Sequence, residues 1–147
     1  MLYVGSNSAI PHKFKEKVDV NSINEYMAYI GVRESPTVGG RGVFALRDFD
    51  AREYVEVCPV INVLKDGIKD GGIIRDYVFS SDMSEEYSSV VLGYGMLYNH
   101  SDDPNLSWFW HGGSMAFWSL RKIPAGSELF INYGKGWWEG RSGSNKV

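Results

Sequence analysis

The stretch YNHSDDPN, residues 98–105, places a dense polar cluster directly after an apolar segment. The side chains of Asn99 and Asn105 each offer hydrogen-bond donors and an acceptor. His100 is open to three roles, as a base, a ligand or a packed structural histidine, and a lone histidine is most often structural. No partner stands at a triad-like spacing, so a hydrolase site is not supported. The stretch indicates a polar site without naming its chemistry.

Two more segments are candidates for the same site: GGRGVFA, residues 39–45, and SELFINYG, residues 127–134. The glycines of Gly40-Arg41-Gly42 allow the backbone to come close to a ligand. This motif lacks the third glycine and the following helix of a dinucleotide fingerprint, so by itself it favours a hairpin turn. Tyr133 ends an apolar segment and can point into a cleft, although a lone tyrosine there is more often a core residue.

The rest of the chain predicts a mainly β domain. Short apolar segments bounded by turn residues predict strands at 28–32, 43–46, 54–64, 73–79, 115–120 and 128–133. Residues 90–98 fit either a short helix or a buried strand. Many short strands separated by glycine turns are typical of a β fold with few helices.

Composition restricts the classes of function. A chain of 147 residues fits one domain. Its net charge of −3 argues against a general nucleic-acid binder, whereas a mildly acidic surface suits a basic peptide. The single cysteine, Cys58, excludes an internal disulfide and a Cys-rich zinc site, so we expect no metal. There is no apolar run long enough for a membrane span and no signal-peptide core, so we expect a soluble intracellular protein without membrane contact.

Taken in order, the three segments resemble the SET family of protein-lysine methyltransferases. That family has a Gly-x-Gly loop before Val-Phe-Ala, an Asn-His segment ending in Pro-Asn, and a Glu-Leu segment ending in Tyr. The pieces DYVF, residues 76–79, and LGYG, residues 92–95, are also similar to family segments. The likeness is greatest to the compact SET proteins of large algal viruses and bacteria. The sequence departs from the family in having Ser101-Asp102-Asp103 where a cysteine is common, and Asn132 where aspartate is frequent.

The resemblance implies a β-clip fold of small sheets in which the Asn-His segment and the Tyr strand form a pseudoknot. It implies residues 28–138 as the SET domain, 1–27 as an N-terminal extension and 139–147 as a flexible tail. It makes Tyr133 the catalytic residue and Tyr77 and Trp137 the walls of a substrate channel. The residues implied for cofactor binding are Gly40, Arg41, Gly42, Asn99, His100 and Trp138.

The function implied is methyl transfer from S-adenosyl-L-methionine to a lysine ε-amine of a protein, with S-adenosyl-L-homocysteine as the product. A histone tail, histone H3 above all, is the expected substrate, and a homodimer is the expected assembly. A histone substrate would place the protein in the nucleus, and another substrate in the cytoplasm. The alternative is a SET-fold module that binds a peptide without catalysis. Turnover of labelled cofactor on histones separates the two.

Overall fold

The structure is a computed structural model that describes residues 29–139. The expected N-terminal extension, residues 1–27, and residues 140–147 of the expected tail lie outside the described residues.

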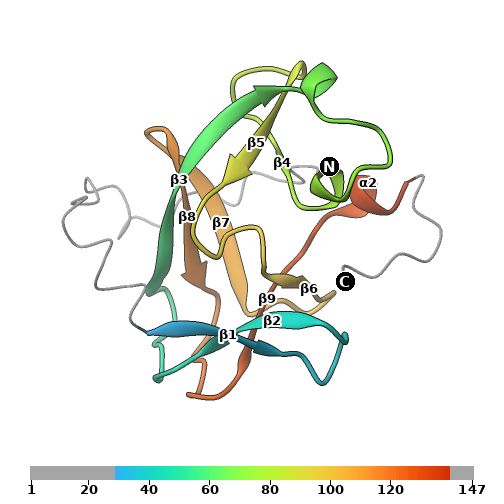
Figure 1. The fold of residues 1–147 in the computed structure, drawn as a ribbon. Helices are drawn as coiled ribbons and strands as arrows, with labels where there is room; N and C mark the ends of the chain where they lie inside the picture. Colours follow the sequence, from blue (N-terminus) through green and yellow to red (C-terminus); the bar gives the residue numbers. More distant parts are fainter. Residues whose placement is uncertain (1–28, 140–147) are drawn as a thin grey trace.

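The described chain folds into two small sheets (Figure 1). In the four-stranded sheet the order is β1 (Ile30–Glu34), β2 (Arg41–Ala45), β9 (Glu128–Ile131) and β6 (Asn99–His100). In the five-stranded sheet the order is β4 (Phe79–Ser80), β5 (Tyr87–Val91), β3 (Tyr54–Leu64), β8 (Ser114–Ser119) and β7 (Leu106–His111). The helices among the described residues are short: the 3-10 helices η3 (Lys65–Gly67) and η4 (Ile73–Asp76), and α2 (Lys135–Trp138). The expected fold class, mainly β with few short helices, is confirmed.

Burial explains why the longest strands form where they do. Residues 55–58 of β3 are all buried, and so are residues 115–119 of β8, its neighbour in the sheet. A strand buried on both faces is mostly apolar along its length rather than alternating, and the polar exceptions in these two stretches are Glu56 and Ser119. The core of the domain is therefore centred on β3 and β8, and it continues into β2 and β9 through Val43 and Leu129.

One strand pairing brings distant segments together. β6 pairs with β9 in parallel, with Asn99 opposite Phe130 and His100 opposite Ile131. Asn105, at the end of the same polar stretch, also bonds to β9. Its Nδ2 donates to the Glu128 carbonyl at 2.8 Å, and its Oδ1 accepts the Phe130 N–H at 2.8 Å. The stretch 98–105 is thereby fixed alongside β9, just before Tyr133.

Two expectations for local structure were wrong. Residues 73–79 do not form one strand: they begin with the 3-10 helix η4, and only Phe79 belongs to a strand. Ile73 is 72% exposed, so its apolar side chain lacks the burial that would favour a strand. Of residues 90–98, expected to form a short helix or a buried strand, residues 90 and 91 end β5, but residues 92–97 form a turn, in which Gly93 has a φ of +68° and the Leu97 N–H donates to the Tyr94 carbonyl.

Candidate active site

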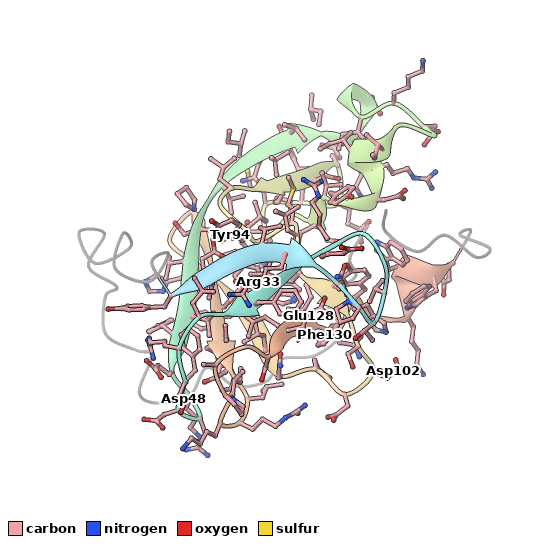
Figure 2. All side chains as sticks on the ribbon, turned by 60° about the horizontal axis from the view of Figure 1, so that its bottom comes forward. Arg33, Asp48, Tyr94, Asp102, Glu128 and Phe130 are labelled. Atoms are coloured by element: carbon pink, nitrogen blue, oxygen red, sulfur yellow. The ribbon has the colours of Figure 1, made fainter. Side chains whose placement is uncertain are left out.

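Tyr133 is buried and held at both its backbone and its hydroxyl. It is 2% exposed and follows the last residue of β9 by two positions. Its hydroxyl donates to the Tyr98 carbonyl at 2.7 Å, and its N–H donates to His100 Nδ1 at 3.1 Å. Since Nδ1 accepts, the imidazole proton is on Nε2, which lies 3.1 Å from an Asp102 carboxylate oxygen. Figure 2 shows Asp102 at the rim of the molecule, where solvent reaches it.

The environment of Tyr133 keeps its hydroxyl protonated. Burial raises the pKa of the Tyr133 hydroxyl well above its usual range, and the neighbouring Tyr77 and Glu128 raise it further. The group is therefore a neutral hydrogen-bond donor rather than a phenolate. Tyr77, a residue expected in the substrate channel, is half-buried at the end of η4, within electrostatic range of Tyr133.

Asn99 is tied to the glycine loop through a buried carboxylate. Its Nδ2 donates to the Arg41 carbonyl at 2.9 Å and to Glu128 Oε1 at 2.8 Å. The other oxygen of Glu128 accepts the Ser35 hydroxyl at 2.8 Å. Figure 2 shows Glu128 in the middle of the molecule, and the side chain is nearly buried. Glu128 thus links β9 to the segments that carry Ser35 and Asn99. The sequence analysis did not identify it as a site residue, although a carboxylate in an otherwise apolar strand could have indicated a buried network.

The glycines of the loop meet two different requirements. Gly40 has a φ of +69°, in the left-handed region that disfavours other residues. Gly42 has no such angle, but a Cβ at this position would collide with the Glu128 carboxylate and lie 3.1 Å from Asn99 Nδ2. The absent side chain at Gly42 therefore leaves room for the Glu128 network.

A pocket of about 200 Å³ opens beside Tyr133, and we call it the Tyr133 pocket. Trp137, buried at 1% exposure, packs on Tyr133 with a centroid separation of 4.9 Å. Trp138 is 40% exposed and meets the His100 ring edge-on at 5.1 Å. The residues that line the pocket are Thr37, Val38, Asn99, His100, Tyr133, Trp137 and Trp138.

Five of the nine predicted site residues therefore share one pocket: Asn99, His100, Tyr133, Trp137 and Trp138. Gly40, Arg41 and Gly42 do not line it, although their loop contributes Thr37 and Val38 and the Arg41 carbonyl bonds to Asn99. Tyr77 does not line it either.

A second pocket, of about 230 Å³, is lined by residues that are adjacent in sequence to the two predicted channel residues, Tyr77 and Trp137. We call it the Val78 pocket; Val78 follows Tyr77, and Gly136 precedes Trp137. Its lining residues are Lys65, Ile68, Asp70, Arg75, Val78, Ser88, Gly136 and Glu139. Both pockets are lined in part by α2, so this short helix lies between them.

Within residues 29–139 there is no group of three His, Cys, Asp or Glu side chains that could hold a metal ion. None of the helices in this part of the chain is both long enough and apolar enough to cross a membrane.

Comparison with known proteins assigns the chain to a family. The SET domain pattern matches residues 40–134. A histone-lysine N-methyltransferase of Schizosaccharomyces pombe, specific for lysine 37 of histone H3, is 32% identical over an alignment of 104 positions that covers 67% of this chain and 69% of that protein.

Two solved structures share the fold. The first is a Plasmodium falciparum protein assigned as a histone methyltransferase, with a TM-score of 0.61 and 31% identity; the match covers 75% of this chain and 96% of that one. The second is a humanized mutant of the Chaetomium thermophilum Polycomb Repressive Complex 2, with a TM-score of 0.60 and 24% identity over 71% of this chain and 15% of that one. The second likeness bears on the fold alone. With the match over residues 40–134 and the fungal relative, these findings show that the chain belongs to the SET-domain family.

Proposed function

We propose that this protein is a protein-lysine methyltransferase that uses S-adenosyl-L-methionine. The observation that carries the proposal is the buried Tyr133 hydroxyl, fixed on the Tyr98 carbonyl at the wall of a pocket shared with Asn99 and His100. In a chain of the SET family, whose relatives include histone-lysine methyltransferases, this arrangement suits methyl transfer better than hydrolysis or redox chemistry.

The residues of the Tyr133 pocket fit an adenosyl cofactor. The half-exposed indole of Trp138 and the imidazole of His100 offer aromatic surfaces for an adenine ring. The loop around Gly40, Arg41 and Gly42 and the Asn99-His100 backbone offer polar groups for the ribose and the amino-acid part. S-adenosyl-L-methionine supplies an electrophilic methyl group on a sulfonium sulfur, and S-adenosyl-L-homocysteine is what remains.

The chain's own residues then favour attack by the lysine amine. A lysine must be neutral to attack, and burial between apolar and aromatic walls disfavours its ammonium form. We assign these walls to Tyr77 and Trp137, whose π-faces also suit a methylated, cationic product. Tyr133 stays neutral and donates its one hydroxyl proton to the Tyr98 carbonyl, so the lone pairs of its oxygen, together with that carbonyl, can orient the reacting groups and stabilise the charge redistribution of the transition state.

The proposed substrate is a histone tail, with histone H3 first, because the S. pombe relative is named for lysine 37 of H3. A histone substrate implies the nucleus, and another substrate implies the cytoplasm. We further propose a homodimer, no requirement for metal and no direct binding of nucleic acid. We also keep as a proposal the likeness to the compact SET proteins of large algal viruses and bacteria, which rests on the sequence motifs alone. We keep residues 28–138 as the SET domain, flanked by 1–27 and 139–147.

The test combines binding and turnover. Calorimetric titration of the purified chain with S-adenosyl-L-homocysteine should show one site per chain, weakened by Trp138→Ala. Incubation with methyl-labelled cofactor and purified core histones should then label a histone. Binding without labelling on any histone or lysate protein would favour the alternative, a SET-fold peptide-binding module. An absence of binding would contradict the proposal.

A further inference from the structure

A buried carboxylate lies behind the proposed active site without lining either pocket. Glu56, in the middle of β3, is completely buried. Taking a carboxylate out of water is costly unless donors surround it, so an apolar residue would serve better if this position were only packed. The groups that bond to Glu56 therefore indicate what it does.

The turn of residues 92–97 is built around this carboxylate. The Tyr94 N–H donates to Glu56 Oε1 at 2.8 Å, and the Tyr98 hydroxyl donates to Oε2 at 2.7 Å. The Cys58 thiol bonds to the same carboxylate. A Cβ on Gly93 would collide with Oε1, so the turn leaves no room for a side chain at this position. Tyr94, labelled in Figure 2, lies within this turn, which leads from β5 to β6.

Tyr98 connects this carboxylate to the catalytic tyrosine. Its side-chain hydroxyl donates to Glu56, and its backbone carbonyl accepts the Tyr133 hydroxyl at 2.7 Å. Tyr98 is itself fully buried and packs on Phe117, with ring centroids 4.8 Å apart. The Tyr98 ring, held at its hydroxyl by Glu56 and at its face by Phe117, therefore restrains the backbone that carries this carbonyl.

We propose that Glu56 is a positioning residue: through Tyr98 it fixes the backbone carbonyl that aims the Tyr133 hydroxyl. The catalytic consequence rests on the proposed function, whereas the structural part does not. Glu56 itself touches neither substrate nor cofactor. Its effect on methyl transfer depends on two hydrogen bonds: the one that Tyr98 donates to Glu56 and the one that Tyr133 donates to Tyr98.

The sequence allows the Tyr98 carbonyl to be observed alone. Asn99 is the single asparagine in the chain that follows a tyrosine. A protein prepared with carbonyl-labelled tyrosine and nitrogen-labelled asparagine therefore gives one carbonyl–amide signal by NMR, from the Tyr98–Asn99 peptide. The carbonyl shift responds to the hydrogen bond that this oxygen accepts. The Tyr133→Phe variant removes that bond and defines the signal without it.

The proposal predicts that Glu56→Gln moves the Tyr98 signal toward the Tyr133→Phe position. The matched control is Ser119→Ala, which removes an equally buried polar side chain whose hydroxyl accepts the Glu53 N–H and donates to the Asp50 carbonyl. The control should leave the signal in place. A folded Glu56→Gln variant with the parent signal would overturn the proposal. So would a Tyr133→Phe variant that leaves the signal unmoved, because the bond between the two tyrosines would then be absent.

A second variant keeps the test decisive if Glu56→Gln does not fold. Tyr98→Phe retains the ring and removes only the bond to Glu56, and a phenylalanine label replaces the tyrosine label because no phenylalanine precedes an asparagine in the parent chain. Adding Tyr133→Phe to this background should displace the signal less than it does in the parent. An equal displacement would overturn the proposal.

The effect of Glu56 on methyl transfer is tested by single-turnover kinetics. Glu56→Gln should slow single-turnover methylation roughly ten- to a hundredfold, the scale for groups that orient a contacting residue. Affinity for S-adenosyl-L-homocysteine should stay within about threefold, since Glu56 acts through Tyr133 rather than on the cofactor. Equal losses in both quantities would contradict the positioning role. If the parent chain methylates nothing, the proposed function fails, while the NMR result still decides whether Glu56 positions the carbonyl.

Discussion

The carboxylate of Glu128 lies against the backbone of Gly42, in the position that the Cβ of any other residue would occupy. The same carboxylate accepts bonds from Ser35 and Asn99, so three segments depend on its placement. The glycine of this motif is explained by an internal network as well as by any approach of the backbone to a ligand.

Gly42→Ala should therefore act through Glu128. The added methyl group displaces the carboxylate and strains its bonds to Asn99 and Ser35, which should lower the free energy of unfolding by about 1–3 kcal/mol. Affinity for S-adenosyl-L-homocysteine should also fall, because Asn99 lines the Tyr133 pocket. Chemical denaturation and calorimetry measure the two effects. Gly67→Ala is the control, since a Cβ there meets nothing within 4 Å; equal effects of both variants would rule out this explanation.

Tyr133→Phe removes one hydroxyl and keeps the ring. If that hydroxyl acts mainly in the transition state, single-turnover methylation should fall by roughly two to three powers of ten, with cofactor affinity little changed. A packing role would cost about 1 kcal/mol of stability and leave the rate nearly intact. Tyr54→Phe, the same change on a ring packed against Phe109, is the control. A Tyr133→Phe variant that melts early yet methylates at the parent rate would refute the catalytic assignment.

The rate of methyl transfer should depend on pH through the substrate rather than through Tyr133. Because burial and its neighbours raise the pKa of Tyr133, the hydroxyl stays protonated between about pH 7 and about pH 9. The rate should rise over this range as more of the substrate lysine becomes neutral. Tyr133→Phe should lower the whole profile without changing its shape. A bend that disappears in the variant would show that Tyr133 titrates in the parent.

Glu56 makes stability depend on pH in a defined direction. Burial raises its pKa above the ordinary 4.5, and hydrogen bonds from Tyr94, Tyr98 and Cys58 offset part of that rise. A raised pKa means that folding favours the protonated acid, so its contribution to stability is complete below about pH 4.5 and is lost as the pH rises through the folded-state pKa. The difference in melting temperature between the parent and Glu56→Gln, parent minus variant, should therefore become smaller as the pH rises from about 4 to about 8. A difference that grows with pH would contradict this direction.

Local patterns were sufficient to predict five of the nine strands among the described residues, whereas the residues of the Tyr133 pocket were predicted from the resemblance to the SET family. The long strand at residues 54–64 was predicted at its exact bounds, because it is rich in Val and Ile and is followed by a polar loop that contains glycine. The polar stretch at 98–105 and the strand ending at Tyr133 were identified as site segments, and the structure places both at one pocket. Their proximity came from the resemblance to the SET family, since the parallel pairing of β6 with β9 leaves no local pattern in either segment.

The features that sequence reasoning missed depend on contacts between distant segments. Glu56 and Glu128 stand in apolar strands, and nothing local shows that donors 38 and 93 residues away compensate for their burial. The helix η4 was predicted as a strand because Ile73 and Ile74 suggest a buried strand, whereas both are exposed. An apolar pair is a weak signal when no neighbouring strand is available to cover it.

Tandem mass spectrometry of one reaction determines whether the chain transfers a methyl group to the ε-amine of a lysine. Purified full-length chain, S-adenosyl-L-methionine and recombinant histone H3 are incubated together, with Tyr133→Phe in parallel. We expect a methyl group on a lysine side-chain nitrogen of H3, at a yield reduced by roughly a hundredfold or more in the variant. If a lysate screen also finds no methyllysine on any protein, although the chain binds the cofactor, the account of this protein as a lysine methyltransferase is contradicted.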